Sequence, residues 1–160
     1  MTNGHNYKTL VLGLGNPILS DDSIGCRVAL AVREKIKRPE IDIIEASIAG
    51  LDFLDLLADY DTAIIIDAIQ TKEGSPGQIY RFEPDMFVNT CDSNTPHGVN
   101  FATAIKLGEQ LGLPLPQRIT IFAVEVKDIV SFSEMCTPEV AAAIPACVSM
   151  VVQEISEHYN

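Results

Sequence analysis

Long apolar runs are absent from this sequence, and basic residues are few. No stretch approaches the roughly 18 to 20 apolar residues that a bilayer-spanning helix requires, and residues 1–8 lack the basic stretch and apolar core of a secretion signal. Lys and Arg number 11 against 22 Asp and Glu, which gives a net charge of -11. So acidic a surface repels phosphate backbones and anionic lipid headgroups. We therefore expect a cytoplasmic protein that binds neither nucleic acid nor membrane.

Paired cysteines are also missing. The four cysteines, Cys26, Cys91, Cys136 and Cys147, lie far apart and form no C-x-x-C pair. This spacing argues against a zinc knuckle, a thioredoxin-like dithiol and a disulfide framework. We expect reduced thiols, most of which fill core positions.

The sequence lacks the motifs of the common protease and nucleotide-binding mechanisms. It has no H-E-x-x-H, no G-x-S-x-G and no cysteine in a recognisable nucleophile setting. A G-x-G-x-x-G fingerprint beginning at Gly13 would need glycine at Ile18, and the G-K-[ST] of a Walker loop is absent. Two acids, Asp21 and Asp22, follow in the same loop and would repel a phosphate. These features argue against a nucleotide site.

What the sequence does contain is a regular alternation of strand and helix patterns over 160 residues, 47% of them hydrophobic. The expected strands are residues 8–14, 41–46, 62–66, 77–83 and 119–126, and the expected helices are residues 23–37, 51–58, 101–111 and 137–155. Residues 1–160 should form a single three-layer α/β domain, with a mostly parallel twisted sheet of about five strands and helices on both faces. Pro145 should bend or break the last helix.

Ligands of parallel sheets gather at the carboxyl ends of the strands, beside the point where the strand order reverses. This rule directs attention to Gly13, Gly15 and Asn16 after the first strand, and to the acids Asp21 and Asp22 that follow. Acids at this position have two explanations. They can favour the positive end of a helix dipole, at about 0.3 to 1 kcal/mol each, or they can serve a functional site. The residue types alone leave both open.

Asp67 follows three isoleucines, at the end of the predicted third strand. An ionised carboxylate among apolar neighbours is costly unless it is paired, hydrogen-bonded or bound to a metal. Asp67 is therefore either a structural acid that caps the turn at residues 74–77 or a functional acid that points into the crevice beside Asp22.

His97 lies in the loop T-P-H-G, just before the predicted helix 101–111. His5 and His158 are near the termini, where we expect them to be exposed and inert. Together with Asp22 and Asp67, His97 completes a set of two carboxylates and one imidazole. Such a set suits a borderline divalent metal ion with open coordination positions.

With these motifs in this order, the sequence resembles the hydrogenase maturation proteases over nearly its whole length. The resemblance rests on V-L-G-L-G-N-P followed by D-D-S-I-G, I-A-G at 48–50, I-I-D-A-I at 65–69, G-S-P-G at 74–77, T-P-H-G at 95–98 and T-P-E at 137–139. It implies an endopeptidase that removes the C-terminal extension of a nickel-iron hydrogenase large-subunit precursor after nickel has been inserted.

The resemblance also implies roles for particular residues. The metal-contacting positions of the family fall on Asp22, Asp67 and His97, with Gly13, Gly15 and Asn16 in the substrate-binding loop. The nickel is carried by the substrate, so the isolated protein should bind it weakly or not at all. Asp22 or Asp67 is the natural general base. Two alternatives remain: a non-catalytic nickel chaperone of hydrogenase assembly and a small-molecule metallohydrolase.

Overall fold

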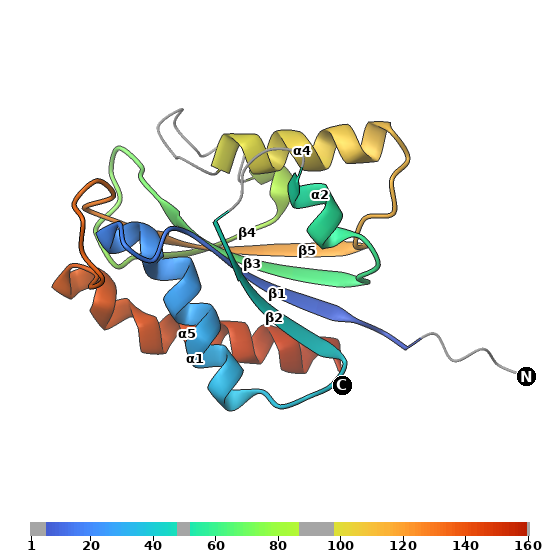
Figure 1. Cartoon of the computed structure of the whole chain (residues 1–160), viewed down its shortest axis with the longest axis horizontal. Helices are drawn as coiled ribbons and strands as arrows, with labels where there is room; N and C mark the ends of the chain where they lie inside the picture. The colour runs from blue at the N-terminus through green and yellow to red at the C-terminus, as the bar shows by residue number, and fades with distance from the viewer. Residues whose placement is uncertain (1–5, 48–51, 87–97, 160) are drawn as a thin grey trace, which may run out of the picture.

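Five strands form one sheet between two layers of helices in the computed structural model, which describes residues 6–47, 52–86 and 98–159 (Figure 1). The strands are β1 (Thr9–Leu14), β2 (Ile41–Ala46), β3 (Thr62–Ile69), β4 (Ile79–Phe82) and β5 (Arg118–Glu125). Their order is β2-β1-β3-β5-β4, with every neighbouring pair parallel except β4 and β5. The predicted single α/β domain is confirmed, and so is the prediction of an edge strand near residues 77–83.

The helices are divided between the two faces of the sheet. Helices α1 (Ile24–Lys35) and α5 (Pro138–His158) cover one face, and α2 (Asp52–Leu57) and α4 (Gly98–Gln110) cover the other (Figure 1). The central strands supply Val11, Ile64, Ile66 and Phe122 to the core under α1 and α5, and Leu12, Ile65, Ile69 and Ile121 to the core under α2 and α4. Because both faces are covered, the central strands β1, β3 and β5 are mainly apolar runs and not alternating ones.

Helix α5 is continuous through Pro145, so of the bend or break expected there, the break does not occur. A proline inside a helix costs about 3 kcal/mol. A break would disturb the apolar stripe of the helix, whose members Val140, Cys147, Val148, Val151 and Ile155 are all buried in the core. Each such side chain gains about 1.5 to 3 kcal/mol on burial, so packing outweighs the proline. At 21 residues α5 is long and apolar enough to cross a bilayer, so the expectation that no stretch approaches that length was wrong. In the folded protein this helix packs against α1.

The expectation for His158 was wrong. Its side chain is only 2% exposed, and Nε2 lies 3.4 Å from Oε1 of Glu154. Burial is the main cause that lowers the pKa of His158. Helix α5 runs three residues beyond the predicted end at residue 155, and this extra turn places His158 over Glu154. His5 lies outside the described residues.

Strand β3 is also longer than predicted, because it ends at Ile69. The last pair between β1 and β3 joins Gly13 and Ile66, whereas the pairing of β3 with β5 continues to Ile69. Asp67 therefore lies inside β3, at the first position beyond the end of the β1 ladder. Since chain order runs outward from β1 to β2 on one side and to β3 on the other, the gap between β1 and β3 is the switch point of the sheet.

Candidate active site

The loop after β1 is shaped by two glycines that allow close packing. Gly15 has a φ of +148°, and a Cβ built on it would lie 1.9 Å from the carbonyl oxygen of Asp22. A Cβ on Gly13 would lie 2.3 Å from the carbonyl oxygen of Gly25 in α1. Both glycines are buried, so they let α1 and the loop approach the end of β1. The part of this loop that a substrate can reach begins at the half-buried Asn16.

Asp22 lies in a short 3-10 helix, η1 (Ser20–Ser23), which precedes α1 and contacts β3. Its side chain is buried, and Oδ2 accepts a hydrogen bond of 3.0 Å from the backbone N–H of Asn16. The carboxylate therefore closes the loop after β1 onto the start of α1. This places an acidic group at the β1 side of the switch point.

Asp67 occupies the β3 side of the same switch point. It is 1% exposed, and Oδ1 accepts a hydrogen bond of 2.8 Å from the N–H of Ala68. Its neighbours at two-residue spacing, Ile65 and Ile69, both belong to the core under α2 and α4. Because side chains alternate along a strand, Asp67 points toward that same face. Helix α4 lies over this face of the sheet (Figure 1).

The Cys26 thiol, in the first turn of α1, has a pKa that is affected by both acids. Its Sγ lies 3.7 Å from the carbonyl oxygen of Gly13 and 3.5 Å from that of Gly15. Burial, followed by the negative charges of Glu45, Asp22 and Asp67, raises the pKa of this thiol to about 11. The charges of Asp22 and Asp67 thus act on the same thiol. The thiol stays protonated near neutral pH, so Cys26 is a core residue and not a nucleophile.

The other described cysteines are free thiols as well. Cys147 is buried and Cys136 is half-buried, which agrees with the expectation that most of the cysteines fill core positions. Cys91 lies outside the described residues.

Asp21 differs from Asp22 in its partners. Its carboxylate accepts hydrogen bonds from the backbone N–H groups of Lys127, Asp128 and Thr137, at 3.0, 2.9 and 2.6 Å, and from the Thr137 hydroxyl. Ser23, the N-cap residue of α1, makes no side-chain cap hydrogen bond. These contacts make Asp21 a structural clamp that joins η1 to the segment after β5 and to the start of α5.

Glu125 is a buried acid that the sequence analysis did not single out. It lies at the end of β5, and its Oε1 accepts hydrogen bonds from the N–H and hydroxyl of Thr71, at 2.8 and 3.1 Å. Its backbone oxygen also accepts from the N–H of Gly77. Glu125 thus supplies the turn-holding contacts considered for Asp67. The sequence pattern could have identified this buried acid, because Glu125 continues the two-residue spacing of Ile121 and Ala123 on an apolar face.

His97, the third proposed metal ligand, lies outside the described residues. It immediately precedes α4, which begins at Gly98. Within residues 6–47, 52–86 and 98–159 no three His, Cys, Asp or Glu side chains are gathered in a way that could hold a metal ion. The structure places Asp22 and Asp67 at the switch point, whereas the role of His97 remains a prediction from the sequence.

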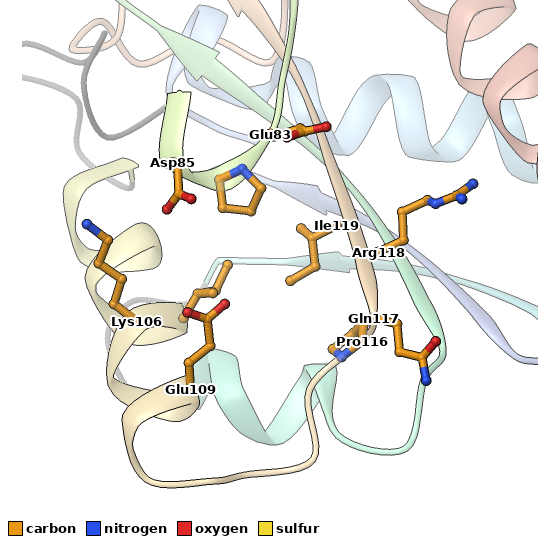
Figure 2. Close-up of a pocket in the computed structure, with 10 residues that line it drawn as sticks. Glu83, Asp85, Lys106, Glu109, Pro116, Gln117, Arg118 and Ile119 are labelled. Carbon is orange, nitrogen blue, oxygen red and sulfur yellow. The ribbon is translucent and has the colours of Figure 1, made fainter.

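A cleft of about 350 Å³ lies elsewhere in the molecule, between α4 and the beginning of β5 (Figure 2). Figure 2 shows Lys106 and Glu109 of α4 on one side of it, with Glu83 and Asp85 above and Arg118 at the start of β5. Asp67 pairs with Ala123, which is five residues beyond Arg118 along β5, so this cleft does not include the candidate site. Its charged side chains are exposed and of both signs.

Comparison with known proteins places this chain in a family. The model of the hydrogenase maturation protease family matches residues 26–154. The hydrogenase 2 maturation protease of Escherichia coli is 30% identical over 155 residues, which cover 94% of this chain and 92% of that protein. The structure of the hydrogenase maturating endopeptidase HybD from E. coli aligns with a TM-score of 0.80 over 94% of this chain and 93% of that one. A [NiFe] hydrogenase maturation protease from Thermococcus kodakarensis, at 21% identity and a TM-score of 0.67, shares the fold.

Proposed function

Since the chain belongs to the hydrogenase maturation protease family and is an endopeptidase of hydrogenase maturation, we propose that it removes the C-terminal extension of a nickel-iron hydrogenase large-subunit precursor. The observation that carries this proposal is the position of Asp22 and Asp67. Two buried carboxylates flank the gap between β1 and β3, where open parallel sheets bind their ligands. The precursor is the proposed partner, and the cytoplasm is the proposed compartment.

The two acids suit a substrate that brings its own nickel. Carboxylate oxygens of Asp22 and Asp67 and the imidazole of His97 are ligands that a borderline divalent ion accepts, and none of them is a thiolate that would retain it firmly. We therefore propose that these three side chains contact nickel already bound to the precursor. The contact holds the adjacent peptide over the switch point, so that binding the metal also orients the bond to be cut.

The remaining task is to activate water for attack on the peptide carbonyl. Asp22 and Asp67 are the bases available at the crevice, and either carboxylate can accept the proton from the attacking water. Asn16, whose N–H is bonded to Asp22, lies at the reachable end of the same loop, and we propose that it contacts the peptide backbone. Gly13 and Gly15 contribute by letting the loop approach α1.

The experiment is to incubate the purified protein with nickel-loaded and nickel-free precursor and to measure the precursor mass. Release of a C-terminal peptide from the nickel-loaded form alone is the expected result. A chaperone would transfer metal and leave the tail intact. A small-molecule metallohydrolase would retain about one metal ion per chain, which elemental analysis of the purified protein would detect.

A further inference from the structure

The most exposed large apolar side chains of the described residues gather on one loop. Val130, Phe132 and Met135 are 77%, 83% and 75% exposed, and they fall within six residues between β5 and α5. Ile18, in the loop after β1, is 48% exposed. Exposed apolar groups that cluster in this way mark interaction sites more often than isolated ones do.

The two loops are joined by backbone hydrogen bonds. The N–H of Ser133 donates to the carbonyl oxygen of Ile18, and the N–H of Ser20 donates to the carbonyl oxygen of Ser133, both at 2.9 Å. Leu19 and Ser133 form a parallel bridge. Figure 1 shows the segment after β5 beside the loop after β1, at the end of the sheet where β1 and β5 finish. Ile18 and the 130–135 segment therefore form one surface, which we name the loop patch.

The loop patch is also held by hydrogen bonds at both ends and within the segment. Asp21 fixes both ends of the segment through Lys127, Asp128 and Thr137. Within it, Oδ1 of Asp128 accepts hydrogen bonds of 3.0 Å from the N–H groups of Val130 and Ser131. A surface that is ordered before binding loses less conformational entropy when a partner covers it. The apolar side chains are therefore presented by a preformed support.

The loop patch begins next to the candidate site. Ser20, which is bonded to the patch segment, is two residues before Asp22 in the same 3-10 helix. A folded precursor that places its tail at Asp22 must bring further surface against this end of the sheet, whereas a small-molecule substrate would not. Phenylalanine and methionine are also enriched at the centres of protein interfaces.

We propose that Ile18, Val130, Phe132 and Met135 form the docking surface for the large-subunit precursor, binding an apolar area of its folded body beside the tail. This inference rests on the proposed function. Docking through the loop patch contributes affinity at a distance from the bond that is cut. Loss of the patch should therefore raise KM more than it lowers kcat.

The test is steady-state cleavage of nickel-loaded precursor by Phe132→Ser and by Val130→Ser/Phe132→Ser. Burial of one such side chain contributes about 1.5 to 3 kcal/mol, so KM should rise roughly tenfold to a hundredfold in the single variant and further in the double variant. Phe132→Leu should recover part of the affinity. The matched control is Leu111→Ser, a side chain 63% exposed in the turn after α4, which should leave KM within about twofold.

The outcomes separate the docking surface from the function on which it rests. Cleavage by the wild-type protein with unchanged KM in the Phe132 variants would overturn the docking surface alone. Failure of the wild-type protein to cleave any nickel-loaded precursor would overturn both. Sedimentation at the same concentrations tests whether a second copy of this chain binds the loop patch instead. If the wild-type protein is a dimer that Phe132→Ser dissociates, and KM is unchanged, the loop patch is a dimer interface and not a precursor-docking surface.

Discussion

The backbone N–H of Asn16 donates a hydrogen bond of 3.0 Å to Oδ2 of Asp22, so that the acid and the loop after β1 hold one another in place. The contact is possible because Gly15, between β1 and Asn16, lies directly under the carbonyl oxygen of Asp22. A single buried carboxylate thus fixes the path of the chain at the switch point, in a segment that contacts β3, the strand of Asp67. Asp22 therefore has both a structural role and a proposed chemical role, so a variant must remove its charge while keeping its hydrogen bond.

The first prediction concerns Gly15. Gly15→Ala should destabilise the protein by about 3 kcal/mol or more, because the new Cβ would meet the Asp22 carbonyl oxygen at 1.9 Å as well as strain a φ of +148°. Gly112→Ala is the matched control, because Gly112 has a φ of +67° with nothing within 4 Å of its would-be Cβ. It should cost only about 1 kcal/mol. Urea unfolding of both variants measures the difference, and equal losses would show that close approach is unimportant.

The second prediction separates the two neighbouring acids. Asp21→Ala should lower the free energy of unfolding by roughly 3 kcal/mol or more, because three backbone N–H groups lose the acceptor that joins them. Asp55→Ala, an exposed acid in α2, should change stability little. Thermal melts compare the two. If Asp21→Ala were as stable as the wild type, Asp21 would not be the clamp described.

The contrast between Asp21 and Asp22 shows where sequence reasoning reaches its limit. The two residues are adjacent and identical in type, and both were open to capping or functional interpretations. What distinguishes them is that the partners of Asp21 lie more than 100 residues away, at 127–137. Local propensity carries no information about such pairing, whereas the strand 41–46 was predicted with its observed bounds from its local apolar pattern.

The end of β3 shows the same limit in another form. The charge at Asp67 was taken as the end of a strand, but β3 continues because β5 supplies pairing partners through Ile69. His158 was misjudged for a related reason, since its distance from the chain end said nothing about the packing of α5. Periodicity predicted which segments are strands or helices and their order along the chain. It did not predict how the strands pair with one another.

The third prediction is a pH dependence of stability that arises from Cys26. The folded protein raises its pKa from 9.0 to about 11, so the thiol contributes stability below pH 9 that is lost as pH rises through 11. A two-unit shift corresponds to roughly 2 to 3 kcal/mol. Cys26→Ser should remove this part of the decline, seen as a smaller drop in the free energy of unfolding between pH 8.5 and 11. Identical pH profiles would contradict the assignment.

The fourth prediction concerns His97. His97→Gln keeps a hydrogen-bonding side chain of similar size but removes the imidazole that would contact the nickel of the precursor. Cleavage of nickel-loaded precursor should fall at least about a hundredfold, with a melting temperature close to that of the wild type. A histidine that only shapes the loop before α4 would tolerate the change at a cost of about 1 kcal/mol or less. Near-normal cleavage would leave the two acids without the proposed third ligand.

The most direct test of the account is the intact mass of nickel-loaded precursor after incubation with the wild-type protein, Asp22→Asn, Asp67→Asn and Asp55→Asn. Asparagine keeps the size and the hydrogen-bond acceptor of each acid but removes its charge and basicity, so both switch-point variants should stay folded. The account predicts loss of the C-terminal peptide with the wild type and with the exposed control Asp55→Asn, and uncleaved precursor with Asp22→Asn and Asp67→Asn. Cleavage at the wild-type rate by folded Asp67→Asn would contradict the assignment of the active site to the gap between β1 and β3.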